Sequence, residues 1–208
     1  MYLYVCTRPD ITHAVNYLSQ FNNCYQEQHW RAAKRVLRYL KCTRNCELVY
    51  FKTGKGIITY VDADWTGDTA DSRSYSGQVT ILANAAVGWE SKKQKTIALS
   101  TAEAEYMALS KACKEAIFVK ELLQALIGNN DPIQIYCDNQ SAIKLSSNPV
   151  FHNRTKHIDI RHHFVRECLH TGKVKIDYCP TGEMVAHILT KGLVQLKHDS
   201  FCSSLGLK

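Results

Sequence analysis

The chain has 208 residues, of which 45% are hydrophobic and 22% are charged. This is the balance of a soluble globular protein, and it excludes disorder as the main state. No apolar run approaches the roughly 18 residues that a membrane-spanning helix needs, so no membrane contact is expected. The nine cysteines include no Cys-x-x-Cys pair, which argues against a disulfide framework and a zinc finger and favours a reducing compartment.

The net charge of +7 is distributed unevenly along the chain. Residues 1–56 carry nine lysines and arginines against three acidic residues, whereas residues 57–208 carry 17 against 16. A basic segment next to a nearly neutral body predicts that the N-terminal part contacts a polyanion. The same charge pattern is equally typical of a solvated basic helix face.

The basic segment contains two stretches with helical periodicity. Apolar residues recur at helical spacing from Ile11 to Phe21, with Thr7 as the expected cap. A second amphipathic helix is expected from Trp30 to Leu40, with arginines and lysines on its other face. Residues 1–55 are therefore predicted to form a helical hairpin.

The hydrophobic pattern changes its period near residue 56, where we place a domain boundary. Strands and helices then follow in the order three strands, helix, strand, two helices, strand and helix. Three strands in series favour antiparallel hairpins, and a strand after the long helix favours a parallel crossover. The prediction for residues 56–208 is an α/β domain with a mixed five-stranded sheet and flanking helices. The expected strands are 57–65, 75–82, 85–90, 133–138 and 174–179, and the expected helices are 100–127, 139–147, 157–171 and 183–191.

Four acidic residues have unusual positions in this predicted fold. Asp62 and Asp64 project from the same face of the first strand, and Asp138 ends an apolar strand. Glu105 falls on the stripe of the long helix that should pack on the sheet. Carboxylates from two strands and a helix could converge on Mg²⁺, which prefers oxygen ligands.

Structural roles for the same residues remain open at this point. Asp62 could cap a turn, Asp138 could cap the helix that follows it, and Glu105 could pair with a lysine. Spacing alone favours these structural roles over a metal site.

Five motifs in a fixed order resemble the ribonuclease H domain of Ty1/copia-type retrotransposon Pol polyproteins. Residues 1–51 resemble the end of the preceding reverse transcriptase, its thumb and connecting region. The motifs are YVDADW at 60–65, SKKQ at 91–94, ALSTAEAEY at 98–106, IYCDNQ at 135–140 and TKHIDIR at 155–161.

The resemblance implies a ribonuclease H-like fold that cuts the RNA strand of an RNA–DNA hybrid with two Mg²⁺ ions, for which Mn²⁺ could substitute. It places the catalytic and metal-binding carboxylates at Asp62, Glu105 and Asp138, with Asp64 as an alternative to Asp62. It further implies the rest of a reverse transcriptase as a partner, no small-molecule cofactor, and a cytoplasmic or nuclear location. The polymerase palm is missing from the sequence, so this chain alone is not expected to polymerise DNA.

One residue departs from the family pattern. The family carries a fourth acidic residue where this chain has His187, in the motif Ala-His-Ile-Leu-Thr-Lys. A neutral imidazole suits transition metals better than Mg²⁺ and supplies no negative charge, so a second metal should bind more weakly. His187 could still act catalytically as a ligand or proton carrier with a shifted metal preference. Alternatively, and this is the interpretation we favour from the sequence, the chain is a decayed copy that binds nucleic acid without efficient cleavage.

Seven polar residues are candidates for nucleic-acid contact, although each could also be ordinary surface. Lysines just before the long helix could meet phosphate at its positive end. An Asn-Gln pair after Asp138 could reach ribose 2′-hydroxyls, which distinguish RNA from DNA. The candidates are Lys92, Lys93 and Lys95, then Asn139 and Gln140, and a second basic cluster with Arg154 and Lys156.

Overall fold

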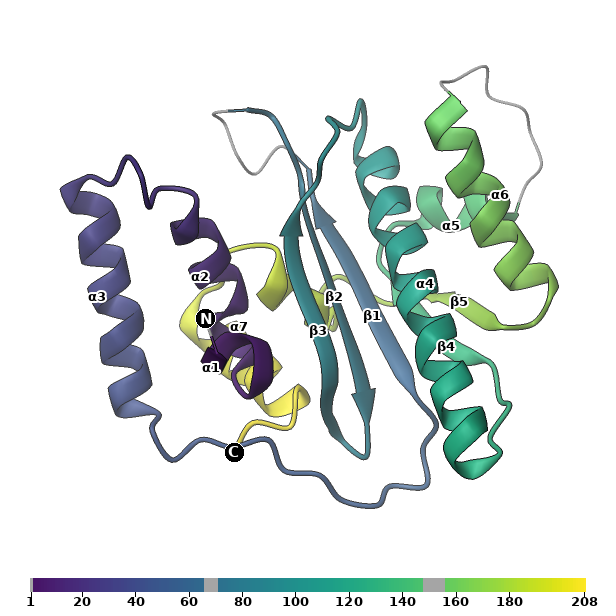
Figure 1. Cartoon of the computed structure of the whole chain (residues 1–208), viewed down its shortest axis with the longest axis horizontal. Coiled ribbons are helices and arrows are strands. Elements are labelled where there is room, and N and C mark those ends of the chain that lie inside the picture. The colour runs from purple at the N-terminus through teal and green to yellow at the C-terminus, as the bar shows by residue number, and fades with distance from the viewer. Residues whose placement is uncertain (1, 66–70, 148–155) are drawn as a thin grey trace.

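A mixed sheet forms the centre of the computed structural model, which describes residues 2–65, 71–147 and 156–208. The strand order is β3-β2-β1-β4-β5 (Figure 1). Strands β1, β2 and β3 pair antiparallel, whereas β4 pairs parallel with both β1 and β5. This arrangement confirms the predicted mixed five-stranded sheet. The strands are β1 (Ile58–Asp64), β2 (Tyr75–Leu82), β3 (Ala85–Lys93), β4 (Ile133–Cys137) and β5 (Val174–Tyr178).

Three helices lie on one face of the sheet (Figure 1). They are α4 (Thr101–Ile127), α5 (Gln140–Ser147) and α6 (Lys156–His170). The odd residues Val61 and Ala63 of β1 are buried in the main core together with Leu109 and other apolar residues of α4. The hydroxyl of Ser100 caps α4 by accepting the amide proton of Glu103 at 3.2 Å, as predicted. No described helix, α4 included, is long and apolar enough to cross a membrane.

The opposite face of the sheet is covered by segments from both ends of the chain (Figure 1). The segments are α1 (Tyr2–Cys6), η1 (Pro9–Ile11), α2 (Thr12–Ser19), η2 (Val185–Leu189) and α7 (Gln195–Ser204). Helix α3 (Glu27–Cys42) packs against α2 and lies further from the sheet. A second core on this face joins Val79 of β2 to Leu189, Phe201 and Leu205. Helix α7 was not expected from the sequence, although it supplies a central side chain of this core.

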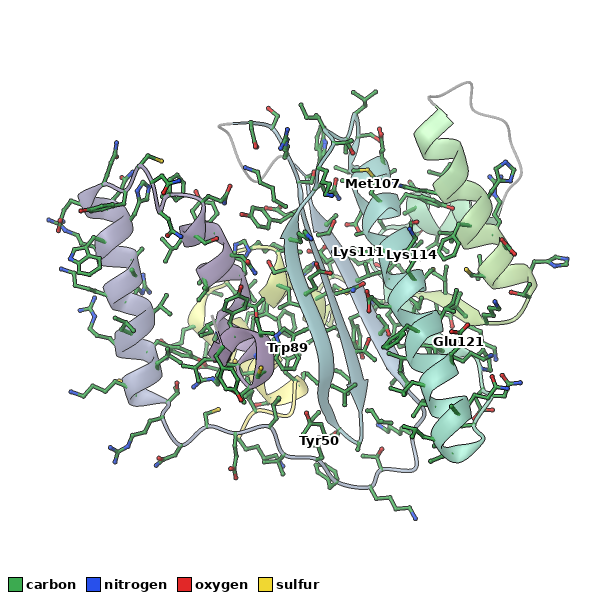
Figure 2. The ribbon with its side chains drawn as sticks, viewed as in Figure 1. Tyr50, Trp89, Met107, Lys111, Lys114 and Glu121 are labelled. Atoms are coloured by element: carbon green, nitrogen blue, oxygen red, sulfur yellow. The ribbon has the colours of Figure 1, made fainter. Side chains whose placement is uncertain are left out.

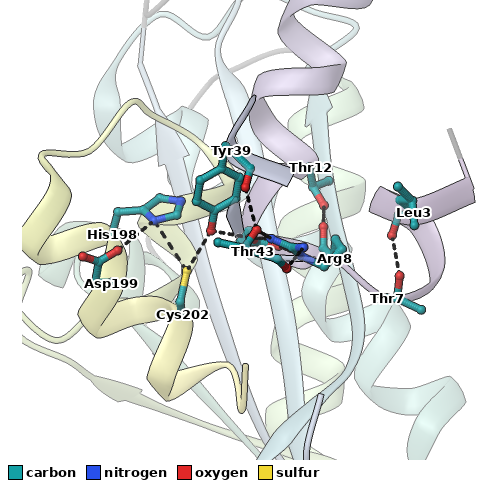
Figure 3. A network of polar contacts seen from close by, with 10 residues as sticks. Leu3, Thr7, Arg8, Thr12, Tyr39, Thr43, His198, Asp199 and Cys202 are labelled. Carbon is teal, nitrogen blue, oxygen red and sulfur yellow. Dashed lines mark hydrogen bonds and ion pairs between the residues drawn. The ribbon is translucent and has the colours of Figure 1, made fainter. Parts of the chain in front are cut away.

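A buried polar network connects the N-terminal helices to α7 (Figure 3). The guanidinium of Arg8 donates two hydrogen bonds to Asp10, at 3.0 and 2.7 Å, and both residues are 5% exposed. The hydroxyl of Tyr39 in α3 also donates to Asp10, and it lies 4.0 Å from the sulfur of Cys202 in α7. Asp10 raises the pKa of Arg8 above its ordinary value, so the guanidinium stays charged.

This network corrects the prediction for the first helix. Thr7 does not cap a helix from Ile11 to Phe21, because its hydroxyl donates to the carbonyl of Leu3 at 3.3 Å in α1. Arg8 follows with a non-helical backbone, and α2 begins only at Thr12. The interruption places the Arg8 side chain against Asp10.

The N-terminal segment is hydrogen-bonded to the edge strand β3 through Trp89 and Tyr50, which are labelled in Figure 2. The indole of Trp89 donates to the carbonyl of Tyr4 at 2.7 Å, and the hydroxyl of Tyr50 donates to the carbonyl of Ala86 at 2.6 Å. Residues before and after position 55 are thus in direct contact. The domain boundary that we place there stays a prediction.

Candidate active site

The parallel pairing of β1 and β4 places two acidic residues side by side. Val61 is opposite Cys137 in this register, so the next residues along the two strands, Asp62 and Asp138, are neighbours. Asp62 is 2% exposed, and the side chain of Asp138 is 10% exposed. Two carboxylates at this depth require a cation or hydrogen-bond donors to offset the cost of burial.

His187 of η2 lies between these two carboxylates. Its Nε2 atom is 3.3 Å from Oδ1 of Asp62 and 3.2 Å from Oδ2 of Asp138. One ligand atom from each of the three residues lies within 4.8 Å of the others, an arrangement that could hold a metal ion. His187 is 1% exposed, and its ring packs at a tilt against Phe201 of α7, with the centroids 6.3 Å apart.

Glu105 approaches the same cluster from the first turns of α4. It is 6% exposed, and the Sγ atom of Cys137 lies 4.0 Å from its Oε2 atom. Burial, followed by the charges of Asp62 and Asp138, raises the pKa of Glu105 to about 9. Glu105 is thus buried beside Asp62 and Asp138, although the ligand atoms that lie within 4.8 Å of one another come from the two aspartates and His187.

Two residues three and four positions after His187 also contact Asp62, and neither contact was predicted from the sequence. The hydroxyl of Thr190 donates a hydrogen bond to Oδ2 of Asp62, and the ammonium of Lys191 lies 3.5 Å from the same oxygen. Burial alone would raise the pKa of Asp62, but His187, Lys191 and Thr190 together lower it. Thr190 and Lys191 belong to the Ile-Leu-Thr-Lys motif, and this motif was the sequence signal that could have identified them.

Asp138 does not cap the helix that follows it, which was the structural role considered for this residue. The side chain of Asn139, not Asp138, caps α5, because its Oδ1 accepts the amide proton of Ala142 at 3.0 Å. Asp64 is half-buried on the same face as Asp62, and burial raises its pKa. In the described part of the chain, however, Asp62 and not Asp64 supplies an oxygen to the cluster with His187.

The predicted lysine cluster lines a cavity of about 350 Å³ beside α4. Lys92 and Lys93 end β3, which runs three residues further than predicted, and Lys95 follows in the connection to α4. Lys92 lies 3.9 Å from Glu90, and Lys93 lies 2.8 Å from Asp71. The remaining cationic residues of the lining were not predicted from the sequence. These are Lys111 and Lys114, which Figure 2 shows along α4, and Arg161 of α6.

The other candidate contacts are placed less completely. Asn139 is partly buried beside Asp138, and Gln140 is exposed at the start of α5. Arg154 lies outside the described residues. Lys156 begins α6, but its side chain also lies outside the description.

Most of the lysines and arginines of the basic N-terminal segment lie on α3. None of the residues of α3 is buried. Arg31 pairs with Glu27 at 3.0 Å, and the ammonium of Lys34 lies 5.7 Å from the ring centroid of Trp30. Its contact with a polyanion stays a prediction.

The strand order and the acidic residues at the ends of β1 and β4 define a ribonuclease H-like fold, as the motifs implied. A solved ribonuclease H1 isolated from compost has a TM-score of 0.49 at 14% identity, over 64% of this chain and 91% of that one. No protein-family model matches the chain.

Curated relatives then identify the family. The chain is 42% identical over 205 residues to the retrovirus-related Pol polyprotein from transposon TNT 1-94 of Nicotiana tabacum, covering 99% of this chain and 15% of that protein. It is 41% identical over 204 residues to the polyprotein from transposon RE1 of Arabidopsis thaliana, covering 97% and 14%. Nearly the whole chain is therefore homologous to one segment of retrotransposon Pol polyproteins, which confirms the predicted resemblance to that family. It spans about one seventh of the length of these relatives.

Proposed function

We propose that this segment of a Pol polyprotein hydrolyses the RNA strand of RNA–DNA hybrids with the help of divalent cations. The observation that carries the proposal is the cluster of Asp62, Asp138 and the buried His187, with Glu105 of α4 buried close enough for the two aspartates to raise its pKa. Carboxylate oxygens are the ligands that Mg²⁺ prefers, and clusters of them hold such ions beside phosphate. The carboxylates therefore fit the divalent cations that the family resemblance implies.

Each residue of the cluster has a defined part in this proposal. Asp62 and Asp138 would hold the cations, and Glu105 would complete the ligand set from α4. Bound Mg²⁺, or Mn²⁺ in its place, would activate the attacking water and stabilise the leaving oxygen of the phosphodiester. Thr190 and Lys191 hold Oδ2 of Asp62 by a hydrogen bond and an ion pair, which orients its other oxygen toward His187.

The cavity beside α4 supplies the proposed contact with the nucleic-acid backbone. Its cationic lining faces a space large enough for a phosphate group, and phosphate contacts provide most of the sequence-independent affinity for nucleic acids. Asn139 retains its amide donor after capping α5, and with Gln140 it could read ribose 2′-hydroxyls next to Asp138.

A binding remnant without efficient cleavage is the second candidate. The observation in its favour is His187, which stands where the family pattern has an acidic residue and contacts both aspartates. An imidazole there adds no negative charge for a second divalent cation.

A cleavage assay with a labelled hybrid separates the two candidates. We expect the wild-type chain to cut the RNA strand with Mg²⁺ or Mn²⁺, to leave RNA–RNA and DNA–DNA duplexes intact, and to lose at least 100-fold in rate on Asp138→Asn. The matched control is Asp131→Asn, which changes an exposed loop aspartate in the same way and should keep the wild-type rate. Hybrid binding without cleavage in either cation would support the remnant, and equal rates for the two variants would contradict the proposed site.

A further inference from the structure

The nitrogen ligand at the candidate metal site distinguishes this chain from an all-carboxylate site. We propose that Asp62, Asp138 and His187 form a mixed site that selects a first-row transition-metal dication, such as Co²⁺ or Mn²⁺, over Mg²⁺. The proposal deepens the proposed function, because it concerns the same site, and it is tested by a separate measurement.

The distances within the cluster match those between neighbouring ligands of one cation. Bonds of about 2.1 Å place adjacent ligand atoms roughly 3.0 Å apart in octahedral geometry and about 3.4 Å apart in tetrahedral geometry. The Nε2 atom of His187 lies 3.3 Å from Oδ1 of Asp62 and 3.2 Å from Oδ2 of Asp138. All three ligand atoms lie within 4.8 Å of one another, so the side chains could close on a single cation.

The imidazole is held in the site by its surroundings. His187 is 1% exposed, and its ring packs against Phe201 of α7. The segment that carries it, η2, lies directly on β2 at Gly77, where an added Cβ would come within 2.8 Å of Leu189. The ring and the segment that carries it are therefore both packed in place, which keeps the nitrogen beside the two carboxylates.

The chemistry of the donor set then decides which cation is favoured. Mg²⁺ requires oxygen ligands in near-ideal octahedral geometry and gives up its waters reluctantly. Imidazole suits transition metals, and affinity rises from Mn²⁺ to Co²⁺ along the first row. Two carboxylates and one imidazole should consequently bind Co²⁺ most tightly of the three ions and Mg²⁺ least tightly.

The test compares metal affinities of the whole chain at one pH and without nucleic acid. Titration calorimetry gives the dissociation constants of Co²⁺ and Mg²⁺, and the visible absorption of Co²⁺ reports nitrogen coordination. We expect His187→Asp to lower the ratio of Co²⁺ to Mg²⁺ affinity at least tenfold and to change the Co²⁺ spectrum. His170→Asp makes the same replacement at an exposed position at the end of α6 and should leave both unchanged.

A second variant keeps the test decisive if His187→Asp fails to fold. His187→Gln preserves the length of the side chain but replaces the nitrogen ligand with an amide, and it should also lower the affinity ratio. Equal ratios and spectra for the wild type and the folded variants would overturn the proposal. Cleavage is scored separately. A changed ratio without cleavage in any cation refutes the proposed function alone, whereas cleavage with an unchanged ratio refutes the metal selectivity alone.

Discussion

Gly77→Ala should disturb the site through the sheet. Gly77 of β2 pairs with Asp62 of β1, and η2 lies directly above it. A Cβ at this position would lie 2.7 Å from Cγ2 of Thr190 and 2.8 Å from Cβ of Leu189, both far below an ordinary carbon–carbon contact of about 3.5–4.0 Å. Because the second neighbour is close to the backbone, relief requires η2 to move by roughly 1 Å.

That displacement has two measurable costs. Overpacking of this kind lowers the free energy of unfolding by about 1–3 kcal/mol, which urea denaturation detects. It also moves His187 and Thr190 away from Asp62, and a misplacement of about 1 Å can reduce a catalytic rate roughly 100-fold. We therefore expect Gly77→Ala to remain folded but to lose most hybrid cleavage and to weaken Co²⁺ binding.

The matched control is Gly88→Ala in the neighbouring strand β3. An added Cβ at Gly88 has no heavy atom within 4 Å, so its stability and activity should stay close to those of the wild type. Wild-type stability and metal affinity in Gly77→Ala would refute the inference that this glycine sets the distance between η2 and the sheet.

Three further changes test the packing around the site. Asp10→Asn leaves the buried guanidinium of Arg8 without its ionic partner and should lower the free energy of unfolding by about 3 kcal/mol, whereas Glu27→Gln removes only an exposed pair and should change it little. Burial lowers the pKa of His13 to about 4, so the unfolded chain binds this proton first as the pH falls below about 6.5. Between pH 6.5 and 4, the free energy of unfolding of the wild type should therefore fall by up to about 3 kcal/mol more than that of His13→Gln. Parallel pH profiles of the two proteins would contradict this prediction. Phe201→Ala removes a side chain of the second core and its contact with His187. It should lower the free energy of unfolding by about 3–5 kcal/mol in a melting experiment and should weaken metal binding as well.

Local periodicity was sufficient to predict the sheet and the acidic residues on it. The alternation of β1 buries Val61 in the main core and turns Asp62 to the other face, so the strand pattern alone separates them. The stripe on α4 likewise identified Glu105, because a carboxylate among buried apolar residues is conspicuous in any helical projection. These signals depend only on neighbours along the chain.

The remaining features depend on contacts between distant residues. Phe201 is the one buried side chain of α7, so this helix has no repeated apolar face for a periodicity argument to find. The approach of η2 to the sheet depends on Gly77, more than 100 residues earlier in the chain. Lys191 reaches Asp62 only because of that approach, and no spacing rule relates the two positions.

The connection that follows α3 is hydrogen-bonded to the residues that follow α7. The backbones of Glu47 and Lys208 exchange hydrogen bonds of 2.9 and 3.0 Å, and Leu48 pairs with Leu207 as an isolated antiparallel bridge. A protease that nicked the turn at 52–56 would therefore not liberate the preceding helices. The two fragments would stay associated as a noncovalent complex, which the contacts of Trp89 with Tyr4 and of Tyr50 with Ala86 would also hold together.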